Sequence, residues 1–342
     1  MHTVVLIPGD GIGPEVTDAM RRVLSAAGAQ INWIERHAGV AALERGGDSV
    51  LPADTMNAIV EHGVAIKGPC TTPIGGGFAS INVALRKKLK LYGAVRPVRS
   101  VKGVATRYED VDLIVVRENT EGLYSGIENI ITEGVITSLK VATDEACRRI
   151  ARFAFTYAVS RGRKKVTAFH KANIMKLSDG LFIRCAKEEH ERGGFASKVQ
   201  YEEMIIDAAC MRIVQNPSQF DVILCENLYG DLISDLCAGL VGGLGVTPGA
   251  NFGDKHALFE AVHGSAPDIA GQNKANPLAV IMSAVMMLRH LAAKRNDQSA
   301  AKVADRVRDA YNVALVAGEK TRDLGGSLGT REFADAVIAR LK

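Results

Sequence analysis

Few aromatic residues and no long apolar run are present in this sequence. Phe, Trp and Tyr make up 5% of its 342 residues, whereas glycine occurs 34 times. That combination fits an α/β protein with many backbone-lined loops. The best apolar stretch, Pro277 to Leu288, is too short to span a membrane. The first predicted strand begins at Thr3, which leaves no room for a signal or transit peptide. We therefore expect a cytoplasmic protein, or one of the mitochondrial matrix if the chain is eukaryotic and processed, with no membrane partner.

The sequence also lacks paired cysteines and a strong excess of charge. No two of its six cysteines form a Cys-x-x-Cys pair, and most lie in apolar segments, so they are predicted to be free thiols of a reduced compartment. The net charge is 42 minus 38, or +4. The basic runs at residues 86–90 and 161–165 contain no interleaved aromatics, so we expect no nucleic-acid partner.

Short apolar strands alternate with amphipathic helices from one end of the chain to the other, which predicts an α/β fold. Residues 125–140 alternate apolar and polar side chains and are interpreted as a strand pair that extends away from the body. Two segments, residues 96–100 and 242–249, are interpreted as crossings between two lobes. We predict a large, cofactor-side domain of residues 1–99 and 252–342, and a small, dimerisation and metal-side domain of residues 100–251.

Two carboxylates stand four residues apart in the segment Asp231-Leu-Ile-Ser-Asp235, which puts both on one face of a predicted helix. Like charges at that spacing repel, and a hard divalent cation with oxygen ligands would compensate them. The segment follows a buried strand, so the carboxylates project from a strand's carboxyl end, where α/β proteins place ligands. The alternative is a solvated helix start, with Asp231 as its N-cap and Asp235 facing water.

Two glycine-rich loops are candidates for ligand binding. Gly9-Asp-Gly-Ile-Gly-Pro14 follows a strand and opens a helix, but its glycine spacing is not that of a dinucleotide-binding Rossmann unit. Its glycines still allow the backbone to approach a ligand closely. Gly75-Gly-Gly77 leads into Ser80, and is interpreted either as a surface loop or as a loop that folds over an anion.

Three arginines follow apolar runs directly: Arg86, Arg96 and Arg117. A guanidinium at the end of an apolar run lowers the stability of the fold unless it binds an anion. Its planar set of N–H donors suits a carboxylate. Together the three predict a substrate with several carboxylates. Structural salt bridges are the alternative for each arginine taken singly.

Taken together, these motifs resemble the isocitrate/isopropylmalate dehydrogenase family, the β-decarboxylating dehydrogenases that act on isocitrate, 3-isopropylmalate, homoisocitrate or tartrate. The resemblance covers essentially the whole chain. The segments that carry it are, in chain order, Ile7–Glu15, Gly68–Gly77, Ser80–Arg86, Arg117–Tyr124, Lys171–Met175, Asn227–Asp235 and His263–Gly271.

The resemblance implies a two-lobed, non-Rossmann α/β fold that binds cofactor and substrate in the interdomain cleft. It also implies a homodimer whose active sites are shared between the two subunits. By this resemblance Asp231 and Asp235 of one chain, with Asp207 of the partner, hold Mg²⁺ or Mn²⁺.

The same resemblance implies the catalytic residues. Lys171 of the partner, assisted by Asp231, takes the proton of the substrate hydroxyl, and hydride leaves for the nicotinamide. After loss of CO₂, Tyr124 protonates the enol carbon. Lys171 and Tyr124 also contact the substrate, whose carboxylates the three arginines orient.

Substrate and cofactor preference are interpreted from two further segments. Ser80 and Asn82 resemble the small polar residues with which isocitrate dehydrogenases bind the third carboxylate of isocitrate. Asp268 and Ile269 stand where NADP-linked relatives have lysine and tyrosine. A carboxylate there accepts from the ribose 2′-hydroxyl and repels a 2′-phosphate, so NAD is predicted. By resemblance the adenine side is lined by His263, Gly264, Ala266 and Asn276, and the nicotinamide side by Thr72, Asn82 and Glu260.

The leading hypothesis is therefore a metal-dependent, NAD-linked isocitrate dehydrogenase of the tricarboxylic acid cycle. Homoisocitrate, tartrate and 3-isopropylmalate dehydrogenases are the alternatives among enzymes. A non-catalytic regulatory subunit of an NAD-linked isocitrate dehydrogenase is the alternative of another class. Such a subunit is expected to have lost some of Tyr124, Lys171, Asp207, Asp231 and Asp235, all of which are present.

Overall fold

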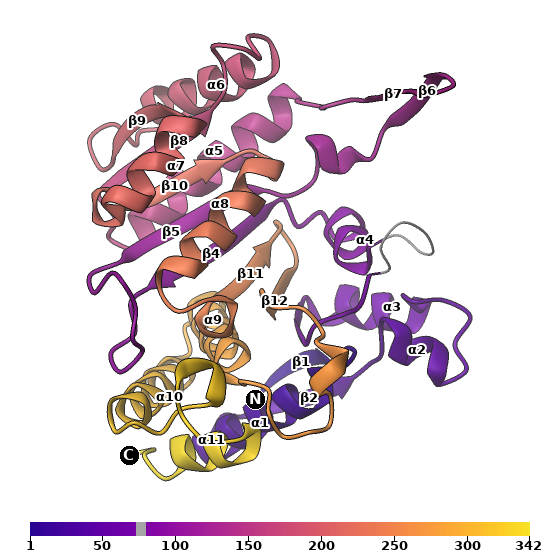
Figure 1. Cartoon of the computed structure of the whole chain (residues 1–342), viewed down its shortest axis with the longest axis vertical. Coiled ribbons are helices and arrows are strands. Elements are labelled where there is room, and N and C mark those ends of the chain that lie inside the picture. The colour runs from indigo at the N-terminus through magenta and orange to yellow at the C-terminus, as the bar shows by residue number, and fades with distance from the viewer. Residues whose placement is uncertain (73–79) are drawn as a thin grey trace. The chain divides into compact units, whose positions relative to one another are not determined.

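The computed structural model of the chain describes residues 1–72 and 80–342 (Figure 1). The predicted anion loop at residues 75–77 lies outside the described residues. The chain divides into two compact units. Unit 1 contains residues 1–85, 100–109 and 241–342, and unit 2 contains residues 86–99 and 110–240. The domain boundaries predicted from the sequence describe a cofactor-side and a metal-side domain, and they stay a prediction.

Unit 1 is built on five strands in the order β2-β1-β3-β12-β11. Their bounds are β1 (His2–Ile7), β2 (Ile31–Glu35), β3 (Val64–Lys67), β11 (Pro248–Phe252) and β12 (Ala257–Ala261). Neighbouring strands are parallel except β11 and β12, which are antiparallel. Strands β1, β3 and β12 are almost wholly buried, as expected for parallel strands covered on both faces.

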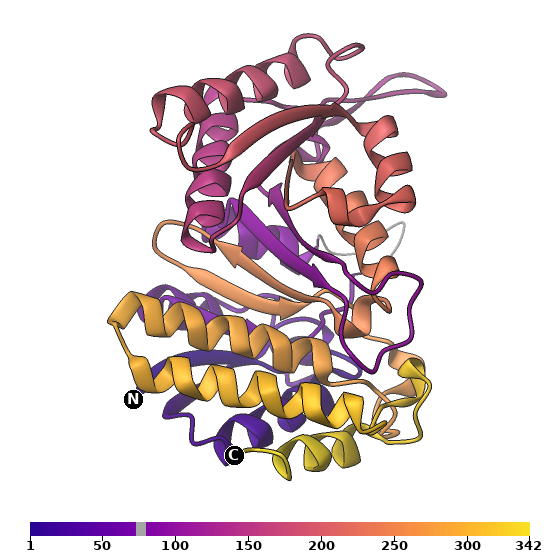
Figure 2. The same ribbon diagram turned by 90° about the vertical axis from the view of Figure 1, so that its left-hand side faces the viewer.

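The helices of unit 1 pack on this sheet and on one another. They are α1 (Gly13–Ala26), α2 (Val40–Glu44), α3 (Ala53–His62), α4 (Ile81–Lys88, which crosses into unit 2), α9 (Leu278–Arg295), α10 (Gln298–Val316) and α11 (Thr330–Ile338), with 3₁₀ turns η3 (Leu244–Val246), η4 (Pro267–Ile269) and η5 (Arg322–Leu324). Helix α9 lies on β3, β11 and β12, and α10 runs beside it (Figure 2). Asn296 ends α9 in the left-handed conformation, and the Asp297 carboxylate caps α10 by accepting from two backbone N–H groups.

Unit 2 contains the strands β4-β5-β10-β8-β9 in that order. Their bounds are β4 (Gly93–Arg99), β5 (Asp112–Glu118), β8 (Lys165–His170), β9 (Gln200–Ile205) and β10 (Val222–Cys225). Strand β4 is antiparallel to β5, and the others are parallel to their neighbours. The register pairs Arg117 of β5 with Cys225 of β10, so both strands end at the same edge of the sheet.

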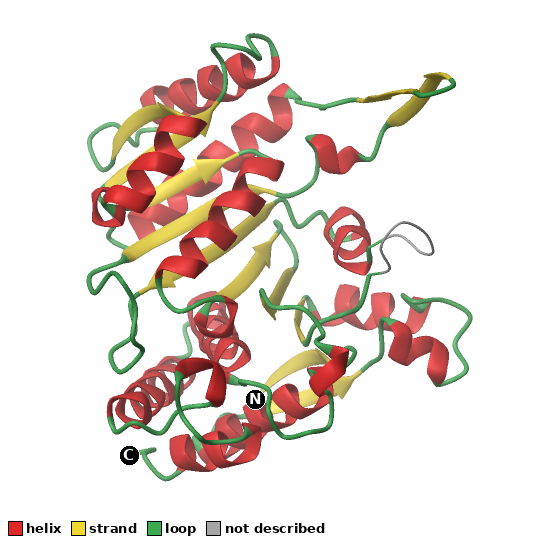
Figure 3. Cartoon of the chain, in the orientation of Figure 1, coloured by secondary structure: helices red, strands yellow, loops and turns green. Residues whose placement is uncertain are grey.

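Helices cover both faces of these strands (Figure 3). Their bounds are α5 (Asp144–Ser160), α6 (Ser178–Arg192), α7 (Ile206–Gln215) and α8 (Asn227–Leu240), with 3₁₀ turns η1 (Leu123–Ser125) and η2 (Pro217–Gln219). Helices α5 and α6 pack together on one face, and α7 and α8 on the other. Helix α5 begins directly after Thr143, whose hydroxyl caps it by accepting from the Ala146 N–H.

A hairpin of β6 (Glu128–Thr132) and β7 (Val135–Ser138) extends away from the body of unit 2 (Figure 1). Every one of its strand residues is exposed, including Ile130, Ile131 and Ile136. The predicted strand pair is therefore confirmed. Apolar side chains on an exposed two-stranded hairpin normally require a partner surface.

Two further expectations are met. The α/β fold class is confirmed, and all six cysteines are free thiols. Within residues 1–72 and 80–342, none of the helices is long and apolar enough to cross a membrane.

Candidate functional site

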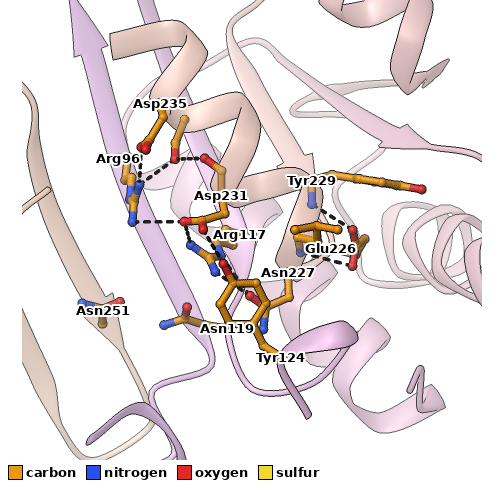
Figure 4. A network of polar contacts seen from close by, with 12 residues as sticks. Arg96, Arg117, Asn119, Tyr124, Glu226, Asn227, Tyr229, Asp231, Asp235 and Asn251 are labelled. Atoms are coloured by element: carbon orange, nitrogen blue, oxygen red, sulfur yellow. Dashed lines mark hydrogen bonds and ion pairs between the residues drawn. The ribbon is translucent and has the colours of Figure 1, made fainter. Parts of the chain in front are cut away.

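The carboxyl ends of β5 and β10 bring together most of the predicted substrate and metal residues of unit 2. Arg117 is the last but one residue of β5, and α8 begins at Asn227, directly after β10. Helix α8 packs on β5 and β4, so Asp231 lies beside Arg117 near the end of β5 and Asp235 lies beside Arg96 of β4 (Figure 4). The alternative of Asp231 as an N-cap is wrong, because the helix starts four residues earlier at Asn227.

Asp231 is the centre of this cluster, and two predicted substrate residues bind it (Figure 4). The Arg117 guanidinium forms an ion pair with one carboxylate oxygen, Oδ1. The Tyr124 hydroxyl donates to the other, Oδ2, at 2.5 Å. The guanidinium of Arg117 also lies over the Tyr124 ring, 4.9 Å from its centroid. The three residues therefore fix one another's orientation.

Asp235 lies one helical turn further on and meets the second predicted arginine. Arg96 donates from NH1 to Asp235 Oδ1 at 3.0 Å and to the Ser234 hydroxyl at 2.7 Å. Its NH2 lies 3.7 Å from Asp231 Oδ1. Arg96 thus bridges both carboxylates of the predicted metal pair (Figure 4).

The electrostatics of the cluster show an excess of positive charge. Burial and then the neighbouring Arg86 lower the pKa of Arg117 to about 10, although Asp231 opposes this. Arg86, Arg96 and Arg117 against Asp231 and Asp235 sum to 3 − 2 = +1 formal charge. A ligand with several carboxylates would relieve the repulsion among the guanidinium groups.

The two aspartates respond in opposite directions. Burial acts to raise the pKa of Asp231, but the charge of Arg117 and the Tyr124 hydrogen bond outweigh burial and hold the pKa below its usual value. Burial raises the pKa of Asp235, and the charge of Asp231 adds to this. Burial, and then the hydrogen bond to Asp231, raise the pKa of Tyr124, so its phenol stays protonated at neutral pH.

Asn227 has a role in this cluster that the sequence interpretation missed. Its side-chain Oδ1 accepts from Nε and NH2 of Arg117, at 3.0 and 2.7 Å, and its Nδ2 donates to the Glu121 carbonyl at 2.8 Å. Asn227 and Arg117 are each 1% exposed. The signal was available, because Asn227 stands at the end of a buried strand, four residues before Asp231.

Lys171 and Asp207 form a second, separate pair in unit 2. The Lys171 ammonium donates to Asp207 Oδ1 at 2.5 Å, and this bond lowers the pKa of Asp207. Asp179, 2% exposed in the first turn of α6, accepts the Lys171 backbone N–H at 2.7 Å. Asp179 also binds the ammonium of Lys140 at 2.5 Å, so a buried ion pair anchors the main chain at Lys171.

The three predicted metal ligands are not gathered within one chain. Among the residues that the structure describes, no group of three or more His, Cys, Asp or Glu side chains is placed to hold a metal ion. Asp231 and Asp235 lie together on α8, whereas Asp207, in the first turn of α7, pairs with Lys171. One chain therefore presents two parts of the predicted site.

The predicted cofactor residues all lie in unit 1, on loops that interlock. The glycine loop donates from Ile12 N–H to the Ser265 carbonyl at 2.9 Å, and the Thr71 and Ser265 hydroxyls are 2.8 Å apart. A Cβ on Gly9 would lie 2.1 Å from the Pro69 carbonyl oxygen, and one on Gly11 would lie 2.0 Å from that of Ser265. These glycines therefore allow the loops to pack closely on one another. The sequence interpretation had instead assigned them to the close approach of a ligand.

Two predicted cofactor residues are held in buried polar contacts. Glu260 forms an ion pair with Lys67 at 2.8 Å and accepts from Asn251 at 2.7 Å. The Asn276 amide donates to Asp323 at 2.9 Å, and its oxygen accepts from the Leu278 N–H at the start of α9. Lys67 was not predicted, because a lysine inside a fully buried strand gives no amphipathic signal.

Two other predicted cofactor residues carry buried polar atoms that lack a partner. These atoms are Nε2 of His263 and Oδ1 of Asn82, each without a hydrogen bond to any described residue of the chain. Burial, opposed by a hydrogen bond to the Gly264 carbonyl, lowers the pKa of His263, which leaves its imidazole neutral. Buried polar groups normally have a hydrogen-bond partner, and a bound ligand would supply one to each of these two atoms.

The remaining predicted residues border these loops. Thr72 and Asp268 are exposed, Ser80 and Ile269 are half-buried, and Gly264 is exposed. Ala266 adopts a left-handed conformation at φ +36°, which is uncommon for a residue other than glycine or asparagine. It redirects the chain into η4, which carries Asp268 and Ile269.

Comparisons with known proteins agree with this architecture. A sequence model of the isocitrate/isopropylmalate dehydrogenase family matches residues 3–337. A catalytic subunit of mitochondrial NAD isocitrate dehydrogenase from Arabidopsis thaliana is 50% identical over 341 residues, covering 99% of this chain and 88% of the relative. A regulatory subunit of the mitochondrial NAD enzyme from Dictyostelium discoideum is 47% identical, covering 100% and 92%.

A solved structure shows the same fold. The crystal structure of isocitrate dehydrogenase from Methylococcus capsulatus superposes with a TM-score of 0.93 at 44% sequence identity. The match covers 100% of this chain and 99% of that one.

Proposed function

The chain belongs to the isocitrate/isopropylmalate dehydrogenase family, and we propose that it converts isocitrate to 2-oxoglutarate and CO₂ with NAD as hydride acceptor and Mg²⁺ or Mn²⁺ as the metal. The observation that carries this proposal is the cluster in which Arg96, Arg117 and Tyr124 surround the carboxylate pair of α8. Its positive excess fits a tricarboxylate, and its oxygen donors fit a hard cation.

The residues present fit a divalent metal. Asp231 and Asp235 offer carboxylate oxygens, and their mutual repulsion contributes to the raised pKa of Asp235. A dication would relieve that repulsion. Asp231 and Asp235, with Asp207 of a second copy, would hold the metal, which when bound supplies Lewis-acid polarisation of the substrate's hydroxyl oxygen.

The cofactor loops of unit 1 fit NAD. The partnerless buried atoms of His263 and Asn82 supply donor or acceptor groups for a dinucleotide. The exposed Asp268 carboxylate is free to accept from a ribose hydroxyl and would repel a 2′-phosphate. All predicted cofactor residues lie in unit 1 and all predicted metal ligands in unit 2, which supports a cofactor-side and a metal-side lobe.

The chain's own residues would supply binding and proton transfer. Arg96 and Arg117 orient the substrate carboxylates, together with the buried Arg86. The Tyr124 phenol, kept protonated by its raised pKa, donates a proton to the carbon that loses CO₂. Lys171 accepts the proton of the substrate hydroxyl. As a base it must be neutral, so its ion pair with Asp207 has to open when the site fills.

We also propose that two copies share each site. Lys171 and Asp207 are paired apart from the α8 carboxylates within one chain. The faces that would meet a second copy carry exposed apolar side chains: Ile130 and Ile136 of the hairpin, Met211 of α7 and Leu232 of α8. A homodimer would bury them and bring Asp207 of the partner to Asp231 and Asp235.

A second candidate function follows from the Dictyostelium relative, which is named a regulatory subunit. Tyr124, Lys171, Asp207, Asp231 and Asp235 are all retained here, which favours a catalytic chain. Homoisocitrate, tartrate and 3-isopropylmalate remain alternatives for the substrate, and Ser80 with Asn82 supports isocitrate. The Arabidopsis and Dictyostelium relatives are named as mitochondrial, and the predicted compartment of this chain stays a prediction.

The test is a set of initial rates for the purified chain. NAD and NADP reduction would be followed with isocitrate, homoisocitrate, tartrate and 3-isopropylmalate, each with Mg²⁺ or Mn²⁺. We expect fast NAD reduction with isocitrate that a chelator abolishes. Preference for another acid would refute the substrate assignment, and inactivity with all four would favour a regulatory subunit.

A further inference from the structure

Asp10 is a buried carboxylate that the proposed mechanism does not use. It lies in the glycine loop between β1 and α1 and is 6% exposed. Its carboxylate accepts two backbone N–H groups from distant parts of unit 1. Oδ2 accepts from Thr71 at 2.7 Å, and Oδ1 accepts from Ala41 at 2.8 Å.

These bonds place Asp10 in a ring of contacts among three loops, residues 9–12, 68–72 and 263–266. Its own N–H donates to the Pro69 carbonyl at 2.7 Å. Thr71, held by the carboxylate, binds the Ser265 hydroxyl at 2.8 Å through its side chain. The Ser265 carbonyl accepts from Ile12 at 2.9 Å, which closes the ring.

None of the residues that form these bonds is a predicted cofactor residue, but several predicted cofactor residues lie in the same loops. Thr72 follows Thr71 directly, and Gly264 and Ala266 flank Ser265. The Thr71 N–H lies in a loop, and the Ala41 N–H lies in the first turn of α2, where a helix leaves its N–H groups without an intrahelical partner, so the carboxylate replaces a backbone partner for both. Bonds from N–H groups to an ionised carboxylate are about twice as strong as neutral ones.

We propose that Asp10 is a positioning residue for the dinucleotide, which fixes the loops at Thr71 and Ser265 in the geometry that receives NAD. This inference rests on the proposed function. Asp10 itself need not touch the cofactor. Loops already held in the binding geometry lose less conformational freedom when the ligand arrives, and affinity rises accordingly.

The chain offers a matched control in Asp297. Its carboxylate also accepts two backbone N–H groups, from Ser299 at 2.9 Å and Ala300 at 3.1 Å. It caps α10, which carries no predicted cofactor residue. Replacing either aspartate with alanine removes two bonds from backbone N–H groups. Asp297→Ala also removes the contact between Asp297 Oδ2 and His2 Nε2, 2.7 Å apart. Only the Asp10 carboxylate accepts from a cofactor loop.

The experiment measures NADH binding to the full chain by the fluorescence of the bound dinucleotide, alongside thermal unfolding and the KM values for NAD and isocitrate. Asp10→Ala is expected to weaken NADH binding by about tenfold or more. The KM for NAD should rise in parallel, whereas the KM for isocitrate should stay within about twofold. Asp297→Ala should lower thermal stability yet leave the NADH affinity near that of the wild type.

Thr71→Val tests the same ring without disturbing Asp10. It removes only the hydroxyl that meets Ser265, and a rise of a few-fold in the NADH dissociation constant is expected. If the wild-type chain binds NADH and neither Asp10→Ala nor Thr71→Val weakens that binding, this inference is refuted while the proposed function stands. Equal weakening by Asp297→Ala would also overturn this inference. A wild-type chain that binds no NADH would overturn the proposed function together with this inference.

Discussion

Replacing Asn227 with alanine tests whether the arginine cluster is held as described. The Asn227 oxygen accepts two N–H groups of Arg117, and both residues are 1% exposed. The substitution leaves Arg117 with its ion pair to Asp231 but removes both of these bonds. A hydrogen bond to a charged group contributes about 1.5–3 kcal/mol, and an entering water would recover part of the loss. We expect the free energy of unfolding to fall by about 2–4 kcal/mol.

The same substitution should affect substrate binding, because a guanidinium that is free to rotate no longer presents a fixed fork to a carboxylate. Urea unfolding followed by circular dichroism gives the stability, and initial rates give the KM for isocitrate, which should rise about tenfold or more. Asn216→Ala is the control. Asn216 also accepts two hydrogen bonds, from Ser218, but in an exposed turn. If Asn227→Ala resembled Asn216→Ala in both stability and KM, Asn227 would not hold Arg117.

Three other predictions concern the proposed roles. Tyr124→Phe should lower kcat by about 10²–10⁴-fold and leave the KM for NAD near that of the wild type; unchanged turnover in initial-rate assays would exclude Tyr124 as proton donor. Because the folded-state pKa of His263 is lowered, its contribution to stability is present above its unfolded pKa and lost as pH falls through the folded pKa. The stability lost between pH 7.5 and 5.5 in urea unfolding should therefore be smaller for His263→Gln. Asp268→Lys combined with Ile269→Tyr should shift the kcat/KM preference from NAD toward NADP, and an unchanged ratio would contradict the ribose assignment.

Part of the unit 2 cluster could be predicted because its signals are local. Asp231 and Asp235 share a helix face through their spacing, and that helix follows a buried strand. Arg117 directly follows the apolar run Leu113–Val116 of β5. Their mutual contacts then follow from the register of β5 and β10, which parallel pairing imposes.

Other contacts depend on residues that are distant in sequence. Lys67 and Glu260 pair because β3 lies beside β12, a neighbour relation that no local pattern indicates. Asn227 has a local signal, because it follows the buried β10, but its partner Arg117 lies 110 positions away and could not be identified from that signal.

Some elements were hidden by their composition. Strand β4 contains Pro97 and three charged or β-breaking positions in seven residues, so it gives no clear strand pattern. It forms because Arg96 and Pro97 pair with Val115 and Ile114 of the buried β5. Strand β2 is half-exposed at the outer position of its sheet, which weakens the apolar signal.

The residues of one chain do not indicate by themselves whether Asp207, Asp231 and Asp235 lie at one site. The pairing of Asp207 with Lys171, away from Asp231 and Asp235, is understandable if the site needs a second copy. A homodimer would then contain two complete sites, each with Tyr124 and the α8 carboxylates from one chain and Lys171 and Asp207 from the other.

A subunit-mixing experiment tests this account most directly. Tyr124→Phe and Lys171→Met chains should each be nearly inactive with isocitrate, NAD and Mg²⁺. Refolded together from an equal mixture, half of the dimers become hybrids, and each hybrid has one intact site, so we predict about one quarter of wild-type activity. Hybrid dimers that form but stay inactive would contradict the shared site, and full activity of either single variant would contradict the proposed chemistry.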